Sequence, residues 1–379
     1  MLSQYHKKNP LFKIMDSTLV QLPAPANISF MWNSGSLLFV CLAIQIISGL
    51  LLASSYSASM EYSFNLISIM METTDKYWLM RCIHANGASL FFICMYTHIG
   101  RGLFFNSFLF THTWSVGVTI LLLTMAAAFL GYVLPVNQMS FWGASVITNL
   151  FSEVPYIGPD IVRIMWGGVS VAGPTIMRFF TFHFLIPFII LMMVIIHITL
   201  LHQTGSSNPL GLNSNHEKII FHPYFSIKDT VGMTFILLLF FYLCLFHPLL
   251  LGDDENFNPA NTAVTPHHIQ PEWYFLFAYA ILRSIPNKLG GVIALLMAIM
   301  ILYITPYTHL AKFKSFTFYP TNKMMFWVWV WVTVLLTWIG MCPVEDPYVL
   351  TGQILTVLYF IYFLTYPLMM KAQDNLMMI

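Results

Sequence analysis

The sequence predicts an all-α membrane protein with eight transmembrane helices, of which the first four form a bundle. Of its 379 residues, 58% are hydrophobic and only 8% are charged, whereas soluble domains usually carry about 25% charged residues. The mean hydropathy is +0.73. Eight stretches of at least 19 residues contain no Asp, Glu, Lys or Arg, and a helix needs about 20 apolar residues to cross the hydrocarbon core of a bilayer.

This composition also excludes several classes of function. There is too little polar surface for an ordinary soluble enzyme, and the net charge of +1 offers no basic patch for nucleic acid. The five cysteines are an odd number without a Cys-x-x-Cys pair, so a disulfide framework, a zinc knuckle and covalent haem attachment are unsupported. The N-terminal residues resemble neither a signal peptide nor a transit peptide, and we expect no removable targeting segment.

The first four spans lie within residues 1–210. The first, near 31–54, lies within a stretch without charges from residue 17 to 60. The second, near 80–104, is free of charges between Arg81 and Arg101, and the third is near 113–135. The fourth, near 179–203, contains Pro187, where we expect a kink because proline removes a backbone donor.

Four further spans follow, near 228–250, 288–308, 324–341 and 349–370. Residues 273–282 are as apolar as any span but too short to cross. We therefore expect them to form a re-entrant or interfacial helix between the fifth and sixth spans. This organisation predicts an N-terminal four-helix bundle over residues 1–210 and a C-terminal four-helix region over residues 211–379.

The charges predict the orientation. Eight spans place both termini on one side, where the segments hold 10 Lys or Arg and 4 Asp or Glu. The opposite loops hold 6 Lys or Arg and 11 Asp or Glu. By the positive-inside rule, the termini lie on the inner side of the membrane.

Four of the 13 histidines lie well inside predicted spans, away from the span ends. His84 and His98 are in the second span and His183 and His197 in the fourth, and the two pairs have the same spacing, i and i+14. A helix rises about 21 Å over such a spacing and returns to nearly the same face. Both spans run from the outer to the inner side, so His84 should lie level with His183, and His98 with His197.

Two imidazoles that face each other in an apolar bundle suit the axial coordination of a haem iron. Zinc or copper would normally require three or four ligands, including Cys or carboxylate, and none is at hand. A single intramembrane histidine more often belongs to a hydrogen-bonded bundle or a proton relay. The repeated spacing on two parallel helices favours two haems, with His84, His98, His183 and His197 as iron ligands.

Glycines and arginines support this interpretation. Gly35 and Gly49 in the first span and Gly117 and Gly131 in the third repeat the i and i+14 spacing of the histidines. Glycine permits the close approach of a flat macrocycle, although small residues also serve helix packing in membranes. Arg81 lies three residues before His84, and Arg101 lies three residues after His98. Each could pair with haem propionates or simply extend to the membrane surface.

Several motifs resemble mitochondrial cytochrome b, the central membrane subunit of ubiquinol–cytochrome c reductase. The resemblance runs from about residue 5 to 370, and the equal spacing within both histidine pairs favours the respiratory branch of the family. Besides the histidine pairs, it rests on HANGAS from His84, GRG from Gly100, GYVLP from Gly131, SFWGASVITNL from Ser140, FHF from Phe182 and PEWYFLFAYAILRS from Pro271.

The resemblance implies two non-covalent b-type haems, with His84 and His183 on the low-potential haem and His98 and His197 on the high-potential one. It implies ubiquinol oxidation at an outer site, with Glu272 as proton acceptor. Other residues of this site are Phe129, Tyr132, Gly143, Ile147, Pro271, Phe275 and Tyr279. It implies ubiquinone reduction at an inner site formed by Asn33, Ser36, His202, Ser206, Lys228 and Asp229.

The family further implies a dimeric complex in the mitochondrial inner membrane with both termini in the matrix. Its partners would be an iron–sulfur protein, a cytochrome c-type subunit and small subunits. Two alternatives are a dehydrogenase anchor that binds two haems and a proton-coupled transporter that uses the histidines as a relay. Eight spans and the Pro271–Tyr274 motif argue against the first, and the lack of an inverted repeat with broken helices argues against the second.

Three places depart from the family pattern. Val136 and Asn137 replace a common Trp-Gly, Glu153 replaces a small apolar residue, and Asp254 replaces a proline. Glu153 adds a charge near the expected outer quinol site. We therefore expect the substitution Glu153→Ala to alter inhibitor affinity while the redox chemistry is retained.

Overall fold

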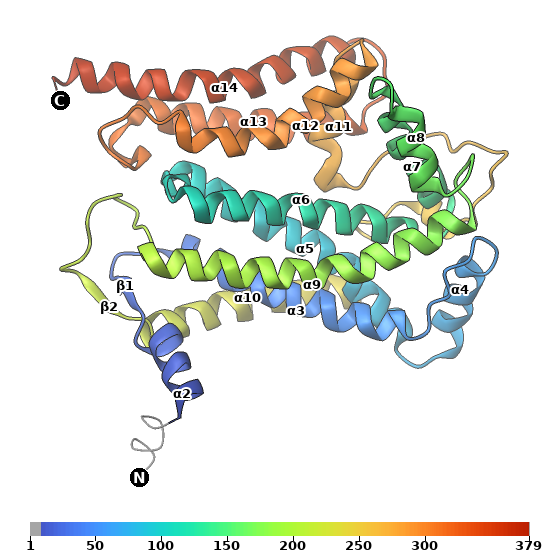
Figure 1. Cartoon of the computed structure of the whole chain (residues 1–379), viewed down its shortest axis with the longest axis horizontal. Helices are drawn as coiled ribbons and strands as arrows, with labels where there is room; N and C mark the ends of the chain where they lie inside the picture. The colour runs from blue at the N-terminus through green and yellow to red at the C-terminus, as the bar shows by residue number, and fades with distance from the viewer. Residues whose placement is uncertain (1–8, 379) are drawn as a thin grey trace.

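The computed structural model describes residues 9–378. Residues 1–8 lie outside the described residues. The family resemblance, expected from about residue 5, begins among them, and so does the N-terminal segment in which we expect no targeting peptide. The molecule is a layered bundle of long helices that run side by side (Figure 1). The long helices are α3 (Ser34–Ala53), α5 (Tyr77–Phe104), α6 (Thr111–Val133), α9 (Gly173–Thr204), α10 (Tyr224–Phe246), α12 (Lys288–Ile304), α13 (Pro320–Met341) and α14 (Tyr348–Leu376).

Shorter elements close the two ends of the bundle. Helix α2 (Pro10–Met15) and the antiparallel strands β1 (Pro23–Pro25) and β2 (Lys218–Ile220) lie at the same end as the C-terminus, whereas α4 (Ser63–Thr73), α7 (Gln138–Asn149) and α8 (Gly158–Trp166) lie at the other (Figure 1). Single turns are η1 (Asp16–Val20), η2 (Phe30–Asn33), η3 (Ser107–Leu109), η4 (Leu150–Glu153), η5 (Asp254–Phe257), η6 (Trp273–Phe275), η7 (Thr305–Tyr307) and η8 (Phe316–Phe318).

Among the described residues, seven helices are long and apolar enough to cross a membrane. They correspond to seven of the eight expected spans, and α9 continues through Pro187. The remaining helix, α5, spans 28 residues but is not one of the seven. It carries His84, Asn86 and His98 in its interior, and these polar residues lower its hydropathy. The eighth span therefore stays a prediction.

The helices pack in two groups. Helix α5 packs on α3 and α9 packs on α6, and α3 also contacts α9. These are the four helices expected to form the N-terminal bundle. Helix α10 packs on α5 and α3, whereas α12, α13 and α14 surround the short α11 (Leu276–Ser284).

Helix α11 accounts for the short apolar segment expected near 273–282. It is buried among α12, α13 and α14. Two glycines allow this close packing, because an added Cβ at Gly291 or Gly340 would lie 2.6 Å from a carbonyl oxygen of Leu282 or Leu276. The segment before α11, which contains Glu272, is thereby held at a fixed place beside the N-terminal bundle.

Candidate functional site

Two pairs of imidazole rings face each other between α5 and α9. The ring centroids of His84 and His183 lie 6.1 Å apart with an interplanar angle of 85°. Those of His98 and His197 lie 6.3 Å apart at 56°. The regular spacing along both helices and their common direction produce this arrangement. Both pairs lie in the interior of the helix bundle.

Hydrogen bonds hold three of the four rings by Nδ1. Ser48 Oγ lies 2.9 Å from His84 Nδ1, and Ser34 Oγ lies 3.1 Å from His98 Nδ1. His183 Nδ1 lies 2.8 Å from the carbonyl oxygen of Ala127. Because a carbonyl only accepts, His183 must carry its proton on Nδ1. Its Nε2 is therefore free to bind a metal, as is usual for histidine ligands with a second hydrogen-bond partner.

The fourth ring has a less complete environment. Nδ1 of His197 is buried and makes no hydrogen bond. The backbone of Thr113 lies beside it, and Thr113 and Ala127 are again related as i and i+14. The surroundings of the two α9 histidines thus follow the same repeat as the histidines themselves.

Each expected glycine faces one imidazole. Gly35 faces His98, Gly49 faces His84 and Gly117 faces His197, with Cβ-to-Cε1 distances of 3.6, 3.0 and 3.1 Å for an added Cβ. Gly131 is closest to its ring, and an added Cβ there would collide with His183. The glycines therefore make room for the imidazole rings. The close approach of a macrocycle to the same glycines stays a prediction.

Two arginines on α5 lie close to the histidine pairs without an acidic partner. The Arg101 guanidinium has a buried Nε without a hydrogen bond and lies 5.2 Å from the ring centroid of Trp32. Its Nη2 is 3.4 Å from His98 Nδ1. Arg81 Nη1 lies 2.7 Å from Met71 Sδ. Neither arginine takes part in the three ion pairs found within residues 9–378.

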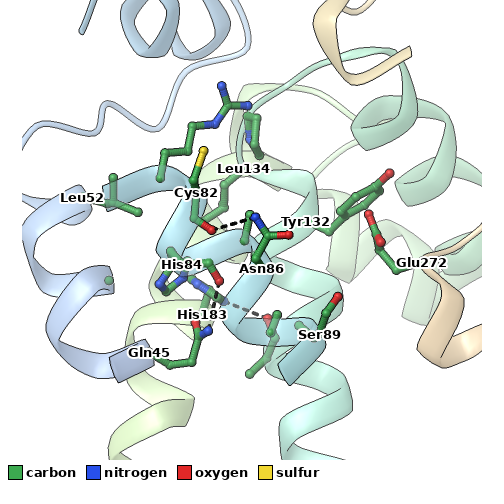
Figure 2. Close-up of a pocket in the computed structure, with 18 of the residues that line it drawn as sticks. Gln45, Leu52, Cys82, His84, Asn86, Ser89, Tyr132, Leu134, His183 and Glu272 are labelled. Carbon is green, nitrogen blue, oxygen red and sulfur yellow. Dashed lines mark hydrogen bonds between the residues drawn. The ribbon is translucent and has the colours of Figure 1, made fainter. Parts of the chain in front are cut away.

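A large cavity adjoins the pair formed by His84 and His183. Its volume is about 390 Å³, within the usual range for small-molecule sites. Gly49, Gly131 and Arg81 line it together with this pair. Figure 2 shows His84 and His183 close together, and Tyr132 beside Glu272 farther away in the same cavity.

A second, smaller pocket lies next to this cavity. Its volume is about 30 Å³, far below the range of about 300–1,000 Å³ that is usual for small-molecule sites. Glu272, Tyr132 and Tyr274 line both spaces. All eight residues expected at the outer site line the small pocket: Phe129, Tyr132, Gly143, Ile147, Pro271, Glu272, Phe275 and Tyr279. Its other lining residues are Tyr274, Val146, Ile269 and Gln270.

Glu272 has the surroundings of a proton acceptor that works near neutral pH. Burial, and then the negative charge of Asp253, raise the pKa of Glu272 to about 7, against the smaller opposite effect of the Tyr132 hydroxyl. Tyr132 Oη also lies 3.3 Å from Asn256 Oδ1. A carboxyl with such a pKa can take up and release a proton under physiological conditions.

The residues expected at the inner site are only partly brought together. Asn33 Nδ2 donates to the Lys228 carbonyl at 2.9 Å, and Ser36 Oγ donates to the Asn33 carbonyl at 2.9 Å. Ser36 also lies beside Asp229. The Lys228 ammonium donates to the Ile28 carbonyl at 2.7 Å. His202, in the last turn of α9, and Ser206 make none of these contacts.

Comparison with known proteins assigns the chain to a family. Residues 19–205 match the family model described as cytochrome b/b6/petB, and residues 259–360 match the one described as cytochrome b(C-terminal)/b6/petD. The chain belongs to the cytochrome b family. A solved cytochrome b fold is similar as well: a chain described as "Hyperthermophilic respiratory Complex III" has a TM-score of 0.88 and 31% identity, over 97% of this chain and 98% of that chain.

None of the four residues that depart from the cytochrome b pattern lines the small pocket. Val136 is buried and has a φ of 54°, a left-handed conformation that is unusual for a β-branched residue and natural for glycine. Asn137 caps α7, because its Oδ1 accepts from the Ser140 amide at 2.8 Å. Asp254 lines the large cavity. The Glu153 carboxylate lies 3.8 Å from Lys288 Nζ and is not among the residues lining the small pocket.

The ion pair sets the size of the effect expected for Glu153→Ala. Because the pair is partly exposed, it contributes at most about 1 kcal/mol. The affinity of an inhibitor in the small pocket should therefore change by no more than about five-fold, with the redox chemistry retained. Inhibitor titrations of the wild type, Glu153→Ala and Lys288→Ala would measure this. Identical curves for the wild type and Glu153→Ala would contradict the prediction.

Several residues that support the site in this cytochrome b fold were not predicted from the sequence. Ser34 and Ser48, which hold His98 and His84, each precede one of the repeated glycines and share their i and i+14 relation. This repeat could have revealed them. The carbonyl of Ala127 and the ring of Tyr274 carry no comparable signal. A backbone acceptor is independent of residue type, and Tyr274 is one of five aromatic residues between 273 and 279.

Proposed function

We propose that this chain is the electron-carrying membrane subunit of a ubiquinol–cytochrome c reductase. It oxidises ubiquinol on the outer side, passes electrons through two non-covalent b-type haems and reduces ubiquinone on the inner side, which contributes to a proton gradient. The observation that carries the proposal is the pair of facing imidazole couples on α5 and α9. Helix α5 is then the eighth span, because 28 helical residues extend over about 42 Å.

The residues present fit a haem at each couple. Two imidazole nitrogens that hold one metal at about 2 Å would place the two ring centres roughly 6 Å apart, since each ring centre lies about 1 Å beyond its nitrogen. The observed separations are 6.1 and 6.3 Å. Within residues 9–378, no group of three or more His, Cys, Asp or Glu residues could hold a metal ion instead.

His84 and His183 would hold the outer, low-potential haem, and His98 and His197 the inner, high-potential one. When bound, each haem supplies an iron that takes up and releases one electron. The unpaired guanidinium groups of Arg81 and Arg101 provide partners for the haem propionates, since a buried cation is stabilised by an anion.

In the outer pocket, Glu272 accepts a proton from the quinol hydroxyl. Tyr132 and Tyr274 line both the small pocket and the large cavity, as Glu272 does. The Glu272 carboxyl therefore lies between the two spaces, with these two rings beside it. The pocket must open to admit a quinol ring, since its volume is only about 30 Å³. The aromatic and aliphatic side chains around it then exclude water.

On the inner side, His202 and Asp229 supply protons to the quinone carbonyls, and Asn33, Ser36, Ser206 and Lys228 complete the pocket. The chain works with an iron–sulfur protein, a cytochrome c-type subunit and small subunits in a dimeric complex. It lies in the mitochondrial inner membrane with both termini in the matrix. The similarity to a chain of a respiratory Complex III supports this assembly.

A reduced-minus-oxidised optical spectrum of the purified complex tests the proposal. We expect two b-type components because there are two imidazole couples. A spectrum without b-type components would exclude electron transfer through this chain and favour the use of the histidines as a proton relay.

A further inference from the structure

The segment that contains Glu272 contacts helix α5 through two hydrogen bonds and one ring stack. Ser89 Oγ accepts a hydrogen bond from Trp273 Nε1 at 3.0 Å. Tyr96 Oη donates to the Tyr274 carbonyl at 2.5 Å. Between these two hydrogen bonds, the ring of Phe92 stacks on that of Tyr274, with a centroid distance of 4.2 Å and an interplanar angle of 7°.

The three α5 residues lie on one face of the helix. They are spaced as i, i+3 and i+7, so at about 100° per residue they fall within a stripe of roughly 60°. By the same arithmetic, His84 and His98 point away from this stripe, roughly 130° around the helix. One rigid helix therefore carries the histidines on one side and holds the Glu272 segment on another.

The contacts are shielded from water. Phe92 is fully buried, and Ser89 and Tyr274 are each 4% exposed. Hydrogen bonds in such surroundings meet little competition from solvent, and leaving one of their groups unpaired is costly. The Phe275 amide also donates to the Glu272 carbonyl at 2.9 Å. A fixed position for Trp273 and Tyr274 therefore fixes the backbone of Glu272.

We propose that Ser89, Phe92 and Tyr96 form a clamp, the α5 clamp, which positions Glu272 between the quinol pocket and the cavity of the His84–His183 couple. This inference rests on the proposed quinol oxidation. The three residues do not touch the reacting atoms in this scheme, and they are positioning residues. Because α5 also carries His84, the clamp sets the place of the proton acceptor relative to that couple.

The substitution Tyr96→Phe tests the clamp in the intact complex. It removes only the hydroxyl group that holds the Tyr274 carbonyl. We expect kcat for a short-tailed ubiquinol to fall about ten-fold, because small displacements of a reacting group have large effects on rate. Looser packing lets water reach Glu272, so the acidic limb of the pH–rate profile should move to lower pH. Ser89→Ala should act in the same direction, and the b-type spectrum should be unchanged.

Tyr303→Phe is the matched control. Its hydroxyl lies 2.8 Å from Thr119 Oγ1 and joins α12 to α6, away from Glu272. The clamp is contradicted if Tyr96→Phe keeps the wild-type kcat and the wild-type acidic limb of the pH–rate profile. It is also contradicted if Tyr303→Phe changes kcat and the limb as much as Tyr96→Phe does. Should Tyr96→Phe fail to assemble, Ser89→Ala decides by the same two measurements. A wild-type complex without b-type components or quinol oxidation would instead contradict the proposed function.

Discussion

Replacing His183 by alanine is expected to remove one of two b-type optical components and to reduce quinol oxidation to background. The substitution leaves His84 without the ring that lies 6.1 Å from it, and a haem iron held by one imidazole loses half of its axial coordination. The electron route is then interrupted at the outer couple. The remaining component should belong to the His98–His197 couple, which shares no ligand with the first.

The spectrum of the purified variant complex, with a parallel assay of quinol oxidation, measures this effect. His112→Ala is a suitable control, because His112 is exposed at the start of α6 and faces no second imidazole in the described chain. Retention of both b-type components in His183→Ala would show that His183 is not an iron ligand.

For Glu272→Gln, we expect quinol oxidation to slow by about a hundred-fold, the usual contribution of a general base. The pKa of Glu272 is raised to about 7, first by burial and then by Asp253. The carboxylate is the form that accepts a proton, so the wild-type rate should rise as pH increases from about 6 to 8. Glutamine cannot titrate, so the variant should lack this limb.

The pH–rate profiles of wild type and variant, measured at saturating quinol, make the comparison. Glu255→Gln serves as a control, because this acid lies in the same loop but lines neither space that Glu272 lines. A wild-type limb that persists unchanged in Glu272→Gln would assign the titration to another group.

The long helices could be predicted because membrane-spanning segments exclude charges. Two short helices were missed for different reasons. Helix α8 carries Asp160 and Arg163, so a search for segments without charges passes over it. Helix α7 lies inside such a segment, from 102 to 152, but begins just after Pro135, where the expected span ended. Short helices at a membrane surface need amphipathic patterns to be recognised.

The predictability of the site differs between its parts. The imidazole couples follow from helical geometry and the common direction of two spans, which the residues themselves provide. The small pocket depends on contacts among α6, α7 and the segment 269–279, and these long-range contacts were accessible only through the family resemblance. His202 and Ser206 show why the inner site is less defined, since no described contact joins them to Asn33 or Asp229.

The regular histidine spacing on α5 and α9 has an electrical consequence. In the proposed scheme, an electron that moved from the outer to the inner couple would travel about 21 Å of an insulating layer about 30 Å thick. It thus crosses roughly two-thirds of any voltage maintained across that layer, which opposes inward movement of negative charge and amounts to roughly 1.5 kcal/mol per 100 mV. Electron transfer between the couples would therefore slow as the membrane becomes energised. The size of this effect follows from the distance between the couples, which the spacing along α5 and α9 determines.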